Sequence, residues 1–331
     1  MSKKEQFLKL YRHEQVEKTP NAMECVALVG QWSSNEYGER NERIRPDVSL
    51  DEFGCEWYHG DRAPVPVPDV YVLDDVCDWR DKVTFPDVSS WDWEALAAEE
   101  LANVDRENQV VMFHSVSGCF ERLVAVMGME EAMIAMVEEP EECKAFFERV
   151  ADYKIELHKM AARYFKPDVI CYADDVATSR GLFIPVEMWR EQLKPAHTRI
   201  IEEIGKLGIY NCQHCCGKPD VLIGDYVEMG VQSWLPAQAD NDLVSVLKEY
   251  GDRFVVIGGY DSQGPCAFEG APDDLIVAEG RRAAGEYAVL GSFAAMCLAG
   301  LATGGQPTED EIRHIVLFGQ GFRERCDELG I

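Results

Sequence analysis

The sequence predicts an α/β fold, a (β/α)8 TIM barrel with a loop-rich N-terminal extension. From about residue 108 onward, short apolar runs alternate with long amphipathic helical patterns, and such alternation is typical of a parallel sheet. No glycine-rich nucleotide fingerprint follows the runs. Their number therefore favours a barrel over a doubly wound open sheet, which is the second candidate.

The predicted strands are short and apolar, and the predicted helices have one apolar face. A long helix is expected over 141–164, where apolar residues recur every three or four positions. A second helix is expected to begin near Pro185 and to end before Gly208, because proline suits the first turn and glycine the position after the last. The predicted strands span residues 110–115, 168–173, 208–213, 231–236, 253–259 and 286–293.

We expect a single domain over residues 1–331, of which about 1–105 form the N-terminal extension and the first barrel elements. Residues 51–93 are rich in Pro, Asp and Trp. Their aromatic content predicts an ordered, loop-rich excursion, since a disordered linker carries fewer aromatic side chains.

Charge and composition exclude several classes of function. The net charge of −28 argues against binding to nucleic-acid phosphates. No apolar run is long enough to span a membrane, and the N-terminus has no apolar signal segment. We therefore expect a cytoplasmic protein that binds neither nucleic acid nor a membrane.

One segment concentrates metal-binding side chains, because residues 212–216 hold three cysteines and a histidine. His214 and Cys216 are two residues apart, so their side chains point the same way from an extended strand end. Catalytic zinc has three protein ligands and an open position. Cys297 follows the last predicted strand and is the predicted third ligand, while Cys212 and Cys215 are expected on the other side of the strand.

Spacing alone leaves two alternatives to a zinc site. All of these cysteines could be small buried hydrophobic residues, as is common for cysteine. Cys212 and Cys215 also form a Cys-x-x-Cys pair, but no helix start follows to lower the pKa of a redox thiol.

Polar residues follow the ends of five predicted strands, and in a barrel these ends converge on the face that carries the active site. These residues are His114, Ser115, Asp174, Asp175, His214, Cys216, Gln238, Tyr260 and Asp261. Adjacent carboxylates point to opposite sides of an extended strand, so one of Asp174 and Asp175 is expected to face the pocket, and the other to cap a helix or to lie in a solvated loop.

The segment HCCGKPDVLIGDYVEMG, residues 214–230, resembles the metal motif of methylcobamide-dependent methyltransferases in the uroporphyrinogen decarboxylase superfamily. Residues 118–142, 172–195 and 258–265 resemble other segments of that superfamily, so the resemblance covers most of the chain. It implies a (β/α)8 barrel and a zinc ion held by His214, Cys216 and Cys297. The decarboxylase itself fits poorly, because its arginine-containing motif is missing from residues 29–45.

The resemblance implies a zinc-dependent methyltransferase, an O-demethylase component. It would move a methyl group from a small methoxylated aromatic donor to the cobalt of a separate corrinoid protein. The chain has no Asp-x-His-x-x-Gly cobalamin signature, so the corrinoid is expected on the partner. The alternative is a methylcobamide:thiol methyltransferase, in which zinc holds the acceptor as a thiolate. The direction of transfer, a homodimer and a fourth zinc ligand such as Glu24 are left open.

Site roles follow from this interpretation. Zinc would polarise the departing oxygen, and Asp175, with Asp174 beside it, would orient the substrate or handle a proton. The remaining predicted residues line the pocket: His114 and Tyr260 as further catalytic groups, and Trp57, Tyr58, Glu121, Tyr172, Trp234 and Gln238 as substrate-binding groups.

Overall fold

The computed structural model describes residues 1–30, 42–60, 64–298 and 307–331, and its central element is a seven-stranded sheet. Every neighbouring pair of strands in this sheet is parallel, which confirms the predicted α/β class. In spatial order the strands are β1 (Val26–Val29), β6 (Val110–Ser115), β7 (Val169–Ala173), β10 (Tyr210–His214), β11 (Ser233–Ala237), β12 (Val255–Gly259) and β13 (Phe293–Met296).

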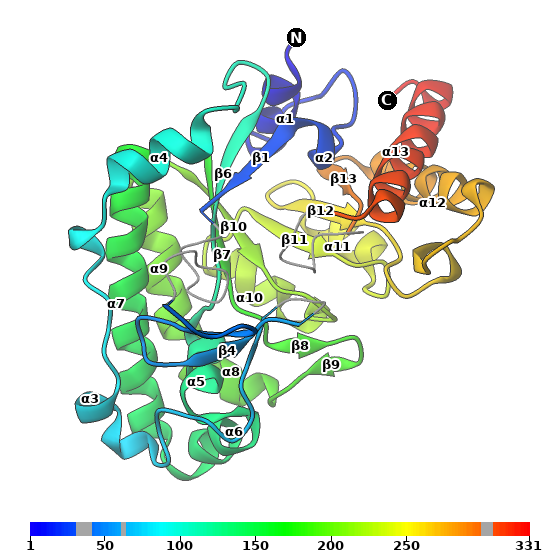
Figure 1. Cartoon of the computed structure of the whole chain (residues 1–331). Helices are drawn as coiled ribbons and strands as arrows, with labels where there is room; N and C mark the ends of the chain where they lie inside the picture. The colour runs from blue at the N-terminus through cyan, green and yellow to red at the C-terminus, as the bar shows by residue number, and fades with distance from the viewer. Residues whose placement is uncertain (31–41, 61–63, 299–306) are drawn as a thin grey trace.

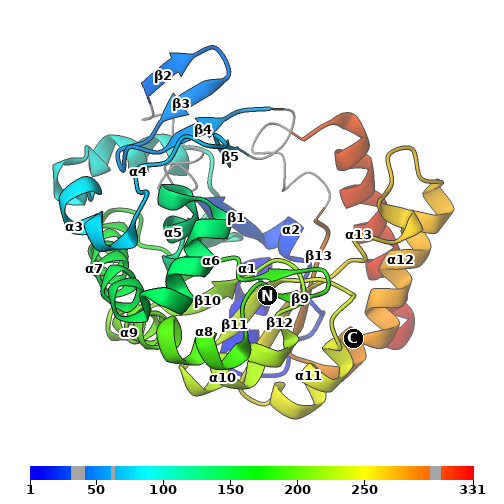
Figure 2. The ribbon, with the colours of Figure 1, turned by 90° about the horizontal axis from the view of Figure 1, so that it is seen from below.

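The sheet curls until its last strand reaches the chain that precedes its first strand. The backbone N–H of Ala295 in β13 donates to the carbonyl oxygen of Pro20 at 2.9 Å, and Asn21 and Ala295 form an isolated parallel bridge. In Figure 2, turned by 90° from Figure 1, α7 and α9 lie on one side of the central strands and α12 and α13 on the opposite side. An eight-stranded barrel was predicted, and seven strands of this sheet lie in the described part of the chain.

Helices cover the outer face of the sheet, with α7 and α9 beside one part of it and α12 and α13 beside another (Figure 1). None of the described helices is long and apolar enough to cross a bilayer. The helices are α1 (Lys3–Tyr11), α2 (Ala22–Cys25), α3 (Trp79–Lys82), α4 (Trp93–Leu101), α5 (Cys119–Met127), α6 (Met129–Glu138), α7 (Pro140–Tyr164), α8 (Val186–Gln192), α9 (Lys194–Lys206), α10 (Ile223–Glu228), α11 (Leu243–Tyr250), α12 (Asp273–Glu286) and α13 (Glu309–Leu329).

The pleat of the strands divides the core into two clusters. The inner cluster takes alternate strand residues such as Met112 and Cys171 and is closed at one end by α1. There, the Tyr11 hydroxyl lies 2.7 Å from Ser233 Oγ. The outer cluster takes the intervening strand residues, such as Phe113, and packs them against the helices. The side of the sheet to which a residue points therefore depends on its place in this alternation.

The loop-rich segment lies between β1 and β6, so it is an insertion within the sheet's strand order. It contains an antiparallel sheet of β2 (Glu42–Arg45), β3 (Val48–Leu50), β4 (Glu56–Tyr58) and β5 (Val65–Pro66). The buried Asp51 carboxylate accepts from Trp57 Nε1 at 3.0 Å and pairs with Arg122 of α5 at 2.9 Å. This contact fixes the small sheet to a helix of the main fold. A further hairpin, β8 (Ala177–Thr178) and β9 (Gly181–Leu182), follows β7.

Most predicted elements agree with the structure, and two have different bounds. The predicted strand 286–293 begins later, at Phe293, because Glu286 still belongs to α12 and the apolar residues Ala288–Leu290 form a 3-10 turn. The predicted helix from Pro185 is divided into α8 and α9 at Leu193, with Pro195 in the first turn of α9. The four-residue strand β1 was not predicted, since so short a run gives little periodic signal.

Candidate metal centre

The carboxyl end of β10 places an imidazole, a thiol and a carboxylate close together. His214 Nε2 lies 3.5 Å from Cys216 Sγ and 3.7 Å from Asp175 Oδ1. All three ligand atoms lie within 4.8 Å of one another. The structure therefore brings together two of the three predicted zinc ligands and one of the two predicted carboxylates.

Strand alternation explains why these three residues meet. His214 and Cys216 are two positions apart and share one side of the chain. In the parallel pairing of β7 and β10, Ala173 lies opposite His214, and Asp175 is two residues further along on the same side. Asp175 Oδ1 also accepts the backbone N–H of Cys216 at 2.7 Å, so the carboxylate orients the segment that carries the thiol.

Three hydrogen bonds fix the backbone of the turn around Cys216. Gly217 has a φ of +81°, and its N–H donates to Gln238 Oε1 at 2.5 Å. Its carbonyl oxygen accepts from Asn241 Nδ2 at 2.9 Å. Trp234 Nε1 donates to the carbonyl oxygen of Cys215 at 3.0 Å. Gln238 and Trp234 were predicted to bind substrate, and in the structure both support the ligand-bearing turn.

The residues present fit a zinc ion. Tetrahedral zinc, with bonds of about 2.1 Å to nitrogen and about 2.3 Å to sulfur, separates those two ligand atoms by about 3.6 Å. The observed separation between His214 Nε2 and Cys216 Sγ is 3.5 Å. Burial lowers the pKa of His214, which favours the neutral imidazole that binds metals. Burial, with the negative charge of Asp175, raises the pKa of the Cys216 thiol, so a cation is needed beside it to hold the thiolate form.

Cys297 is not part of this group of ligand atoms. It follows β13 and is fully buried in the outer cluster, because it shares the alternation of Phe293 and Ala295, which also pack outward. Cys297 lies two residues before the segment 299–306, which is outside the described residues. Its role as a zinc ligand stays a prediction.

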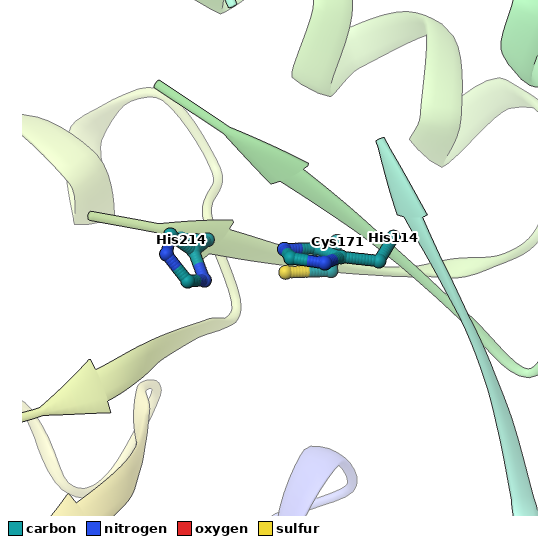
Figure 3. A group of neighbouring side chains, drawn as sticks. All are labelled: His114, Cys171 and His214. Carbon is teal, nitrogen blue, oxygen red and sulfur yellow. The ribbon is translucent and has the colours of Figure 1, made fainter. Parts of the chain in front are cut away.

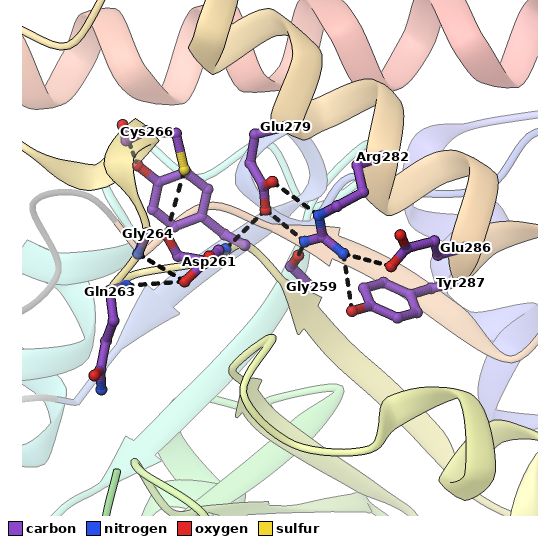
Figure 4. A network of polar contacts seen from close by, with 10 residues as sticks. Gly259, Asp261, Gln263, Gly264, Cys266, Glu279, Arg282, Glu286 and Tyr287 are labelled. Carbon is purple, nitrogen blue, oxygen red and sulfur yellow. Dashed lines mark hydrogen bonds and ion pairs between the residues drawn. The ribbon is translucent and has the colours of Figure 1, made fainter.

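Tyr260 also lies on the outer side, next to α13. Its hydroxyl donates to the carbonyl oxygen of Cys266 at 3.2 Å, its ring packs edge-on against Phe318, and burial, then Cys297, raises its pKa. The neighbouring Asp261 belongs to a network that continues through Glu279 and Arg282 (Figure 4). This network braces the end of β12, so the structure gives Tyr260 and Asp261 structural contacts.

Asp174 faces away from Asp175, as alternation requires. The Asp174 carboxylate is fully buried and accepts the backbone N–H groups of Phe120 and Glu121, each at 3.0 Å. His197 Nε2 lies 2.8 Å from the same carboxylate. These contacts make Asp174 the cap of α5, which is the second of the two roles expected for this pair.

The other predicted substrate-binding residues are distributed over the fold. Tyr172 is buried, and its hydroxyl oxygen accepts a hydrogen bond from the Cys119 N–H at 3.0 Å. Trp57 is also buried and donates its Nε1–H to the Asp51 carboxylate. Tyr58 is exposed on β4. Glu121 accepts the Gly118 N–H at 3.2 Å, and its charge acts on Cys216, so it lies near the centre. Glu24 pairs with Lys3 and Arg323 and does not join the centre.

His114 lies beside the centre, on the inner face of the sheet. Its ring centroid is 5.0 Å from that of His214, and burial, then His214, lowers its pKa. Cys171 completes a second group with these two histidines. Cys171 was not singled out from the sequence, although its place two residues before Ala173 on β7 could have put it on the inner side. Cys212 is also in the inner cluster, which corrects its predicted position on the other side from His214.

The fold and the site together define a parallel α/β protein with a candidate metal centre at the carboxyl ends of its strands. The family model for uroporphyrinogen decarboxylase (URO-D) matches residues 48–281. The chain belongs to the URO-D family, as the sequence resemblance indicated.

Among solved structures, a methyltransferase from Methanosarcina mazei has the same fold. It is 14% identical, with a TM-score of 0.69 over 100% of both chains. A second structure, of an uncharacterized protein, is 13% identical and reaches a TM-score of only 0.28 over 53% of this chain and 47% of the other. No curated protein matches the chain in sequence.

Proposed function

We propose that this protein is a zinc-dependent methyltransferase that moves a methyl group from a small methoxylated aromatic donor to the cobalt of a separate corrinoid protein. The observation that carries the proposal is the group formed by Asp175, His214 and Cys216 at the ends of β7 and β10. URO-D family membership and the fold shared with a methyltransferase support it. The curled seven-stranded sheet is, in this proposal, the described part of a (β/α)8 barrel.

A zinc ion bound at this centre would act as a Lewis acid on the oxygen that leaves the donor. His214 and Cys216 would hold the ion. The third ligand would be Asp175, which the structure places beside them, or Cys297, which the sequence motif indicates. Asp175 also fixes the Cys216 backbone, and Gln238 and Asn241 hold the following turn.

One observation favours a second candidate, transfer of methyl from a methylated corrinoid to a thiol. Five of the residues expected to line the pocket are aromatic, and such a lining would suit an aromatic donor. In the structure Trp57, Tyr172, Trp234 and Tyr260 are buried in packing contacts of their own, and Tyr58 is exposed on β4. Without that lining, an acceptor thiol activated by zinc has equal chemical support.

A single-turnover experiment separates the two functions. The zinc-loaded protein is mixed with a reduced corrinoid protein and a methoxyarene, and methyl-cobalt formation is followed by absorbance. In the reverse arm, a methylated corrinoid is mixed with a thiol. Methyl transfer only in the first arm supports the proposal, transfer only in the second supports the thiol methyltransferase, and decarboxylation of uroporphyrinogen without methyl transfer would contradict both.

Matched variants connect activity to the centre. Cys216→Ser should abolish methyl transfer, whereas Cys215→Ser should retain it, because Cys215 is buried in the outer cluster. Zinc content of Asp175→Ala and Cys297→Ala then identifies the third ligand as the residue whose loss releases the metal.

A further inference from the structure

A second set of metal-binding side chains lies on the inner face of the sheet. His114 at the end of β6, Cys171 in β7 and His214 at the end of β10 each offer one ligand atom, and these atoms lie within 4.8 Å of one another. In Figure 3 the Cys171 sulfur and the His114 ring lie together between their strands, and the sulfur points toward His214. Three neighbouring strands therefore contribute to one inner group.

Strand register explains this grouping. In the parallel pairing of β6 and β7, His114 lies opposite Cys171, and both point inward. Cys171 lies in turn opposite Cys212 of β10, so His214, two residues further on, is one layer nearer the carboxyl ends of the strands. His214 thus belongs to both groups and lies between the His114–Cys171 pair and the Asp175–Cys216 pair.

The two ring nitrogens of His214 differ in the polar atoms that surround them. Nε2 is the atom near Cys216 Sγ and Asp175 Oδ1. Nδ1 is buried and has no hydrogen-bond partner in the described part of the chain. A buried polar atom without a partner is costly, and a metal ion bound to Nδ1 would remove that cost.

We propose that His114, Cys171 and His214 form a second metal position, so that His214 bridges two ions, with Nε2 on the outer ion and Nδ1 on the inner one. The donors are two imidazoles and a thiolate, a set that suits zinc among the common divalent ions. Bridging requires the His214 ring to release its remaining proton to solvent.

Charge balance supports two ions. The His214 imidazolate, the Cys171 and Cys216 thiolates and the Asp175 carboxylate carry one negative charge each, and together they match two divalent cations. The Lys154 ammonium adds one positive charge near His114, and the Glu121 carboxylate adds one negative charge near Cys216, so the balance is kept. A balanced charge matters here because unpaired charge is expensive in a buried site.

Zinc stoichiometry tests this inference. The purified protein is stripped with a chelator, reloaded with excess zinc, desalted and measured by mass spectrometry of the metal. We expect two equivalents for the unmodified chain and one for Cys171→Ser. Cys212→Ser is the matched control, since Cys212 is the buried inward neighbour in register with Cys171, and it should keep two equivalents.

A single equivalent in the unmodified chain, or two in Cys171→Ser, would overturn the inner position. A second measurement needs no variant and so remains valid if Cys171→Ser fails to fold. On titration of the metal-free chain with Co²⁺, the thiolate-to-cobalt charge-transfer band should grow through two equivalents, because each position has its own thiolate. Saturation at one equivalent would contradict the proposal and leave the outer centre, and the proposed methyl transfer, intact.

Discussion

Gln238 accepts the backbone N–H of Gly217 at 2.5 Å, and this contact ties the end of β11 to the turn that follows the candidate ligand Cys216. Gln238 Nε2 also donates to Ser262 Oγ at 2.7 Å, beyond the end of β12. The ligand-bearing turn is therefore held from two neighbouring strands.

Replacing Gln238 should weaken metal binding. Gln238→Leu removes the acceptor for Gly217 N–H, and losing a residue that orients a ligand typically lowers metal affinity about 10- to 100-fold. Zinc affinity measured by competition with a chelating dye checks this expectation. Gln263→Leu, at an exposed site in the loop after β12, is the control and should bind zinc as the unmodified chain does. Equal affinity in both variants would show that Gln238 does not position the ligand.

Gly217→Ala should destabilise the fold more than an ordinary glycine substitution. Its φ is +81°, and an added Cβ would lie 2.6 Å from the carbonyl oxygen of Thr178 in β8. Gly208 has a similar φ of +72° but open space around it, so Gly208→Ala measures the backbone strain alone, about 1 kcal/mol. The difference in melting temperature between the two variants reports the collision with Thr178. Equal melting temperatures would mean that the β8–β9 hairpin moves to accommodate the added Cβ without a cost in stability.

Alanine substitutions of the two adjacent aspartates should have opposite effects, one mainly on stability and the other mainly on zinc binding. Asp174→Ala removes the acceptor of two backbone N–H groups and the partner of His197. We expect it to cost roughly 2–4 kcal/mol of unfolding free energy while zinc binding is kept. Asp175→Ala should change the unfolding free energy by less than about 1 kcal/mol and reduce zinc binding. Urea unfolding of the metal-free chains and zinc content of the loaded ones separate the two effects, and a reversed pattern would contradict the assignment of Asp175 to the centre.

His158 in α7 should make the protein sensitive to acid. Burial lowers its pKa to about 3, and the Lys154 charge adds to this. The unfolded chain takes up the His158 proton near pH 6.5, whereas the folded chain resists it, so the unfolded state binds more protons between those pH values. Stability is complete above about pH 6.5 and falls as the pH drops toward 3, by about 2 kcal/mol at pH 5 for this residue.

Urea unfolding of His158→Leu at pH 8 and pH 5 checks this. The loss of stability between the two pH values should be about 2 kcal/mol smaller than in the unmodified chain. His13→Leu, at an exposed position in the loop after α1, is the control and should change the pH dependence less than His158→Leu does, because partial burial lowers the pKa of His13 by a smaller amount. If His158→Leu keeps the full pH dependence, another group is responsible for it.

Sequence periodicity predicted most strands of the central sheet but fewer of the site residues. Strands such as Val110–Ser115 and Val169–Ala173 are continuous apolar runs between amphipathic helices, so their class and approximate bounds could be predicted. The pair His214 and Cys216 could also be predicted, because a two-residue spacing at a strand end has a clear geometric meaning.

Predicting the remaining site residues requires knowing which face of the sheet each side chain points to and how it packs, and a single sequence does not reveal either. Tyr172 and Trp234 lie within apolar strands and Tyr260 directly follows one, but each points outward into the helices. Cys297 was placed after a strand expected to end at residue 293, whereas β13 runs on to Met296. The role of Gln238 arises from a contact with Gly217, and such contacts become visible only when neighbouring strands are placed in register.

The contact between Pro20 and Ala295 has a consequence for how this chain is made. The segment before β1 leaves the ribosome long before the strand that it meets. Translation proceeds at about 5–20 residues per second, so synthesis of the chain between these two segments takes many seconds. Over that time Pro20 and Asn21 would lack their contact with Ala295, so we expect the nascent chain to need protection from aggregation until residue 295 has emerged.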